Sequence, residues 1–142
     1  MSRILFTAFL FLAFAPLLRA AEHEPNTQQF KALCDVALDM DHTTIGEAYE
    51  DRFGNAIRGD MVNALKTCGP RSKPPYVVYL IFVVAPDGKV EHIFADPDQP
   101  VSACVAAKLA RLKVPSPPKP PVKPKGEPNP YWLQLVSIDI NE

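Results

Sequence analysis

The chain has 142 residues, a formal net charge of −1 and 47% hydrophobic side chains. This length accommodates one domain with a small appendage and excludes a large multidomain enzyme. A net charge close to zero argues against a nucleic acid as the main partner, because binding to phosphates needs a clear excess of basic residues. Two features of the composition are unusual, the 16 prolines and the odd number of three cysteines.

The first 20 residues have the pattern of a secretory signal peptide. Arg3 supplies the positive start, an apolar run extends from Ile4 to Ala15, and Pro16 precedes a small-residue end at Ala20. The apolar run is too short to cross a bilayer as a helix, which needs about 20 residues. We therefore expect cleavage after Ala20, export to the periplasm and no stable membrane anchor after cleavage.

The rest of the chain is acidic near its start and basic near its end. Residues 22–60 contain nine acidic and three basic side chains, whereas Lys108–Lys125 contains six basic side chains and no acidic one. Eight of the 16 prolines lie between residues 115 and 130. Because proline breaks helices and central strands, this stretch is expected to be an irregular Pro/Lys-rich loop.

The first half of the mature chain is expected to be helical. Residues 26–38 and 57–68 each carry apolar side chains at the three- and four-residue spacing of a one-sided helix. Between them, Thr44 and Glu47 have the spacing of a capping box, which predicts a short additional helix that ends near Gly54.

The second half is expected to form a small sheet with one helix. Tyr76–Ala85 is a run of β-branched and aromatic side chains, typical of a strand covered on both faces. Pro86–Lys89 predicts a turn into a returning strand, Val90–Ala95. Pro100–Lys113 has the apolar spacing of a helix, and Tyr131–Ile140 predicts the last strand.

This order predicts an α+β fold, a three-stranded antiparallel β-β-α-β sheet with the first strand in the centre. The last helix would cover one face of the sheet, and the N-terminal helices would cover the other as a lid. The expected organisation is a signal peptide at residues 1–20, a helical segment at 21–70, and a β-β-α-β domain at 71–142 that includes the loop 115–130.

The second part resembles the TonB C-terminal domain family, in particular its relatives at the ends of AgmX-like gliding-motility proteins. The resemblance covers residues 76–140 and is carried by the hairpin at Asp87–Val90, the helical stretch Cys104–Pro118 and the final amphipathic strand. Where the relatives have an aromatic, a basic residue, an aromatic and a proline, this chain has Leu112–Pro115, without either aromatic. The resemblance implies a binding module rather than a catalyst, since TonB C-terminal domains capture an extended peptide at a sheet edge.

Three cysteines in an exported protein allow one disulfide and leave one thiol over. Cys34 and Cys68 lie on apolar stripes of helices that are expected to pack together, which favours this pair. The rival pair is Cys68 with Cys104, which would tie the helical segment to the sheet helix. Cys104 with His92 as its base is the catalytic alternative, but a cysteine on an inward-facing stripe is more typical of packing.

The sequence predicts no cofactor and offers two weak metal signals. Cleavage after Ala20 would leave His23 as the third residue, and a terminal amine, two amide nitrogens and an imidazole can form a square-planar Cu(II) or Ni(II) site. Asp39, Asp41 and His42 form a polar cluster at a helix end, where a helix terminus in solvent is the expected structure.

We therefore expect an exported, non-enzymatic interaction module of the bacterial envelope whose protein partner docks on a sheet edge or on the Pro/Lys-rich loop. Val90–Ala95 and Tyr131–Ile140 are the expected edge strands, with Tyr131 and Trp132 as exposed anchors. The lysines that the loop would present are Lys119, Lys123 and Lys125. The alternatives are a periplasmic inhibitor or immunity protein against a toxic enzyme, and a small envelope metal carrier or thiol enzyme.

Overall fold

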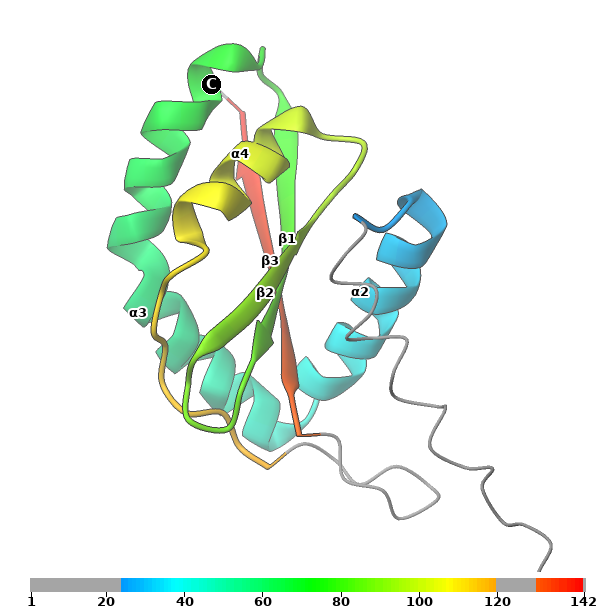
Figure 1. The fold of residues 1–142 in the computed structure, drawn as a ribbon, viewed down its shortest axis with the longest axis vertical. Helices are drawn as coiled ribbons and strands as arrows, with labels where there is room; N and C mark the ends of the chain where they lie inside the picture. The colour runs from blue at the N-terminus through cyan, green and yellow to red at the C-terminus, as the bar shows by residue number, and fades with distance from the viewer. Residues whose placement is uncertain (1–23, 120–129, 142) are drawn as a thin grey trace, which may run out of the picture.

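The computed structural model describes residues 24–119 and 130–141, which form a three-stranded antiparallel sheet with helices on both faces (Figure 1). The elements are α2 (Thr27–Asp41), α3 (Thr44–Cys68), the 3-10 turn η2 (Gly69–Arg71), β1 (Tyr76–Val84), β2 (Val90–Ala95), α4 (Pro100–Leu109) and β3 (Trp132–Ile140). The strand order β2-β1-β3 places the first strand in the centre and confirms the predicted α+β fold.

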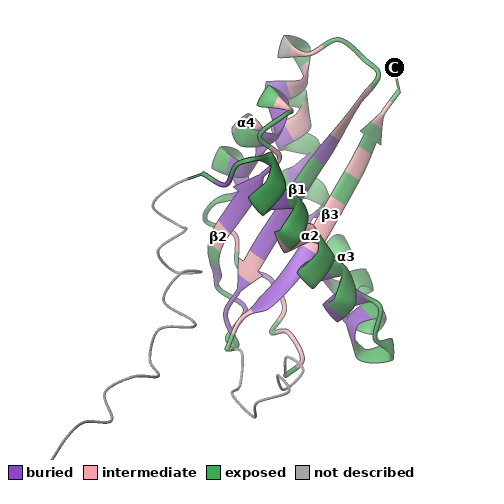
Figure 2. Ribbon diagram, turned by 90° about the vertical axis from the view of Figure 1, so that its right-hand side faces the viewer, coloured by how far each residue is buried: buried purple, intermediate pink, exposed green. Residues whose placement is uncertain are grey.

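The central strand β1 is buried on both faces. Leu80, Ile81 and Phe82 are consecutive and fully buried. Because neighbouring side chains of a strand point to opposite faces, both faces must be covered to bury all three. Figure 2 shows the same burial along most of β1 and β2. This double coverage explains why the run lacks an apolar–polar alternation.

Residues 44–68 form one long helix, whereas the sequence predicted two shorter ones. Gly54 lies exposed in the middle of α3 and lowers the local helix propensity without ending the helix. The N-cap is Thr43, whose side chain accepts a hydrogen bond from the Gly46 N–H at 2.9 Å, rather than Thr44. The helix continues because a buried stripe runs past the glycine at four-residue intervals, through Tyr49, Phe53, Ile57 and Met61.

The helices divide between the two faces of the sheet. Figure 1 shows α2 on one side and α3 beside α4 on the other, and the ring of Phe53 in α3 packs edge-on against Phe82 of β1 at 5.0 Å. The expected lid over the face opposite α4 is therefore correct for α2 and wrong for α3. Helices and strands share one hydrophobic core, so the N-terminal helices belong to the same folded body as the sheet.

A disulfide joins Cys68 at the end of α3 to Cys104 in α4, with Cα atoms 5.8 Å apart. The favoured pair Cys34–Cys68 is therefore wrong, and the rival pair is the one observed. The reason is the division of the helices, because α2 places Cys34 on the opposite face of the sheet, where it is a free thiol. The disulfide is consistent with an oxidising compartment and leaves Cys104 without a free thiol for catalysis.

Candidate functional site: a groove along the edge of β3

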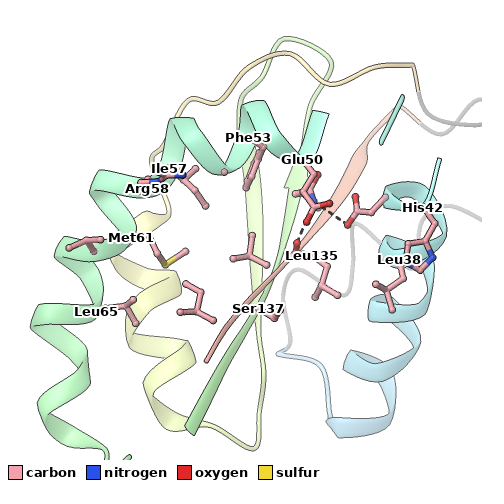
Figure 3. A pocket seen from close by; sticks show the side chains of 16 residues that line it. Leu38, His42, Glu50, Phe53, Ile57, Arg58, Met61, Leu65, Leu135 and Ser137 are labelled. Atoms are coloured by element: carbon pink, nitrogen blue, oxygen red, sulfur yellow. Dashed lines mark hydrogen bonds between the residues drawn. The ribbon is translucent and has the colours of Figure 1, made fainter. Parts of the chain in front are cut away.

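A groove of about 440 Å³ lies along the outer edge of β3, the side of this strand that does not pair with β1. Figure 3 shows that α3 forms one wall of this groove and the C-terminal end of α2 forms the other. The α3 wall is mainly apolar and contains Phe53, Ile57, Met61, Val62 and Leu65. The α2 wall contains Leu38, Asp41 and His42.

The first half of the β3 edge is capped by the corner between α2 and α3. In an antiparallel pair, alternate residues direct their N–H and C=O groups away from the neighbouring strand. The Leu133 N–H donates to Sδ of Met40 at 3.4 Å, and the Leu135 C=O accepts from Nε2 of Gln134 at 3.3 Å. These two strand residues, which we call the capped edge, therefore have partners outside the sheet.

The second half of the β3 edge is open. The alternation that turns Leu133 and Leu135 outward also turns Ser137 and Asp139 outward. Within residues 24–119 and 130–141, no hydrogen bond satisfies the outward backbone groups of these two residues, which we call the open edge. Figure 2 shows that this half of β3 alternates between half-buried and exposed residues, unlike β1.

The other edge strand of the sheet is β2. Ile93 and Ala95 are both buried, and α4 packs against this strand. The segment that follows α4 returns to the hairpin, where the Val114 N–H donates to the Gly88 carbonyl at 2.9 Å. Both predicted edge strands are confirmed as edges of the sheet, and the groove lies beside β3.

Asp41 is a buried acid at the end of the groove. Its side chain is 6% exposed, Oδ2 accepts a hydrogen bond from Nε2 of Gln134 at 3.1 Å, and Oδ1 has no partner among the described residues. Burial is the main cause that raises the pKa of Asp41 to about 7, and the Glu50 carboxylate adds to this rise. Hydrogen bonds from the Leu135 backbone and from Gln134 oppose the rise in pKa, because they stabilise the charged form.

Gln134 links this acid to the core of the sheet. Its Oε1 accepts a hydrogen bond from Nε1 of Trp132 at 3.2 Å, while its Nε2 donates to Asp41. Trp132 is only 1% exposed and packs edge-on against Tyr49 at 5.6 Å, so its prediction as an exposed anchor is wrong. Its side chain points towards α3, which the sequence had not placed on this face. Tyr131, the other predicted anchor, is half-buried.

Of the other predicted site residues, Lys119 does not line the groove. Lys119 is exposed, whereas Lys123, Lys125 and His23 lie outside the described residues, as does the predicted signal peptide. Within residues 24–119 and 130–141, no group of three His, Cys, Asp or Glu side chains is placed to hold a metal ion. No helix in the same ranges is both long and apolar enough to cross a membrane.

The sequence had placed Asp41 at a helix end in solvent: the helix does end at Asp41, but the predicted exposure is wrong. A signal for its burial was present, because Phe30, Cys34, Ala37 and Asp41 follow one another at the spacing of a single helix face. Phe30 and Ala37 are buried on that face. Asp41 therefore continues the apolar stripe, although it carries a charge.

No protein-family model matches the chain, and no curated protein or solved structure is significantly similar to it. The resemblance to the TonB C-terminal domain family therefore stays a prediction from the sequence.

Proposed function

We propose that the chain is an exported, non-enzymatic interaction module that binds an extended segment of a partner protein by strand addition to the open edge of β3. The observation that carries the proposal is the groove beside the unpaired backbone groups of Ser137 and Asp139. In strand addition, main-chain hydrogen bonds supply affinity and side-chain pockets supply selectivity. The resemblance to the TonB C-terminal domain family implies the same mode of binding.

The walls of the groove favour a segment with apolar side chains at alternate positions. Side chains of an added strand alternate between the two faces of the sheet. On the α3 side they would contact Val62, which is 45% exposed, and the half-buried Val136 and Ile138. On the α2 side they would lie beside Ser137 and Asp139, which are exposed. One face of the segment is therefore buried and the other stays largely in water.

The proposed periplasmic location rests on the N-terminal sequence and is supported by the Cys68–Cys104 disulfide. This disulfide also argues against the thiol-enzyme alternative, because that alternative depends on a free thiol at Cys104, which is bonded to Cys68. An inhibitor of a periplasmic enzyme would be a special case of the proposed module, in which the segment bound at β3 belongs to the enzyme.

Replacing Ser137 with proline tests the proposal. Proline removes the N–H that points into the groove and leaves the ladder to β1 intact, because Ser137 does not donate to β1. The purified chain would be used to select peptides from a display library of random octapeptides, and the affinities of the enriched peptides would be measured by calorimetry. We expect these peptides to shift the amide resonances of Ser137 and Asp139, and Ser137→Pro to weaken binding by about tenfold or more.

Ser137→Ala is the matched control, since it removes the hydroxyl but keeps the N–H, and it should bind like the wild type. Urea unfolding would establish that the proline variant is folded. Enriched peptides that bind Ser137→Pro as tightly as the wild type would exclude strand addition at this edge. A wild-type chain that sediments as a dimer, with Ser137→Pro as a monomer, would assign the open edge to a second copy and overturn the proposal.

A further inference from the structure

Resting on the proposed strand addition, we propose that the groove selects a segment with a basic side chain, which binds to Asp41 and Glu50. Both residues line the groove, Asp41 from the end of α2 and Glu50, which Figure 3 labels, from the first turns of α3. A lysine ammonium or an arginine guanidinium placed there would donate to Oδ1 of Asp41, the buried oxygen that has no partner in the described part of the chain. The ligand is therefore an extended apolar segment with a cation at one end.

No cation in the described ranges pairs with these two carboxylates. The one ion pair found there joins Lys89 and Glu91 in the hairpin, away from the groove. The guanidinium of Arg52 lies over an aromatic ring of its own helix at 5.6 Å, and Arg58, which lines the groove, donates to a side chain of its own helix at 3.2 Å. Because buried polar atoms rarely lack a partner, an unpaired carboxylate oxygen at the end of a groove indicates a missing donor.

The position of Asp41 along β3 determines where the basic residue must lie. Asp41 contacts Gln134 and Leu135, at the point where the capped edge ends and the open edge begins. Ser137 is two residues further along the strand, about 7 Å away at the usual rise per residue. In the bound segment, a lysine next to the residue that pairs with Ser137 has a side chain long enough to span this distance and reach Asp41. The basic residue therefore belongs at the end of the bound segment that lies nearest the α2–α3 corner.

Synthetic peptides test this selectivity. The probes are six-residue peptides of alternating valine and threonine, blocked at both termini, with lysine at the amino or the carboxyl end to match either strand direction. The matched probes carry acetyl-lysine at the same position, which keeps the side-chain length and removes the charge. We expect one lysine peptide to bind the wild-type chain about tenfold more tightly than its acetylated counterpart.

Two variants of groove residues and one variant of a surface residue test whether the two carboxylates cause this preference for lysine. Glu50→Gln and Asp41→Asn should each reduce the preference for the lysine peptide over the acetyl-lysine peptide by severalfold. Asp60→Asn, an equal change of charge at an exposed position of α3 outside the groove, should leave the preference as it is. Equal binding of the two peptides to the wild type would overturn the cation site and leave strand addition standing. Peptides that do not bind at all, or that bind without shifting the Ser137 amide resonance, would overturn both proposals.

Discussion

Asp41 carries a carboxylate that the fold buries without an opposite charge. Burial of an ionised group has a high free-energy cost unless the group is paired, and the groups that hydrogen-bond to Asp41 are neutral amides. Glu50 faces it from α3 with the same sign of charge, and His42 lines the same groove. The free energy of unfolding of the isolated chain should therefore depend on the protonation of this one side chain.

We predict that Asp41 makes the chain less stable as the pH rises from about 4 to about 7. The pKa of this carboxyl is raised from 3.8 to about 7 in the folded state, so in this interval the native state keeps a proton that the unfolded state has released. Below this window both states are protonated, and above it the full destabilisation is present. Asp41→Asn removes the titration and should keep the hydrogen bond from Gln134. Urea unfolding between pH 4 and 8 should show a gain in stability for the variant that grows with pH and levels off above pH 7.

Asp39→Asn is the control for this measurement, because Asp39 belongs to the same helix and is exposed. Its stability relative to the wild type should stay constant over the same interval. If Asp41→Asn and the wild type kept a constant difference from pH 4 to 8, Asp41 would not be the buried acid that the structure describes.

The corner between α2 and α3 is the element that shapes the groove. It carries the chain from one face of the sheet to the other across the capped edge of β3. Thr43 stabilises the corner twice, because its hydroxyl donates to the Met40 carbonyl at 3.0 Å and accepts from the Gly46 N–H at 2.9 Å. At Gly46 the backbones are so close that a Cβ would overlap the Met40 carbonyl oxygen and lie 2.8 Å from that of Asp41.

Substitution of two glycines of α3, Gly46 and Gly54, should therefore change the stability of the chain in opposite directions. Gly46→Ala should lower the free energy of unfolding by about 2 kcal/mol, because the corner must open to admit the methyl group. Gly54→Ala should raise it by about 0.5–1 kcal/mol, because no atom lies within 4 Å of the new methyl group and alanine favours the helix. Urea unfolding of the two variants measures both effects. A stable Gly46→Ala variant that also keeps its peptide affinity would show that the close approach at this corner is not required.

Strands were predictable from local chemistry, and helix packing was not. The observed β2 has the predicted bounds, and β1 and β3 each differ from the prediction by one residue. Strand bounds could be predicted because they depend on turn residues and on runs of β-branched side chains, which are neighbours in the sequence. The face that α3 occupies depends on pairs such as Phe53 with Phe82, which no local pattern specifies. The groove is non-local in the same way, since Asp41 and Gln134 lie 93 residues apart. An exposed edge could be predicted, but the walls beside it could not.

At the scale of the whole molecule, the two faces of the sheet are secured differently. On one face, α3 and α4 are joined by the Cys68–Cys104 disulfide and pack with β1. On the other face, α2 is held by packing and by hydrogen bonds such as that from the Thr27 hydroxyl to Asp98 at 3.0 Å. The apolar wall of the groove thus belongs to the cross-linked layer, and the wall that carries Asp41 belongs to the layer held without a cross-link.

Reduction of the disulfide should destabilise the chain without unfolding it. The bond joins residues 36 apart, and closing a loop of this size contributes about 4 kcal/mol by restricting the unfolded state. Urea unfolding with and without a thiol reductant should show a difference of this order. The Cys34→Ala variant should show the same difference, because Cys34 is the free thiol. The stability of the Cys104→Ala variant should not change with reductant. If instead the stability of the Cys34→Ala variant did not change with reductant, the bond would be assigned to Cys34, and α2 would have to lie on the same face of the sheet as α3.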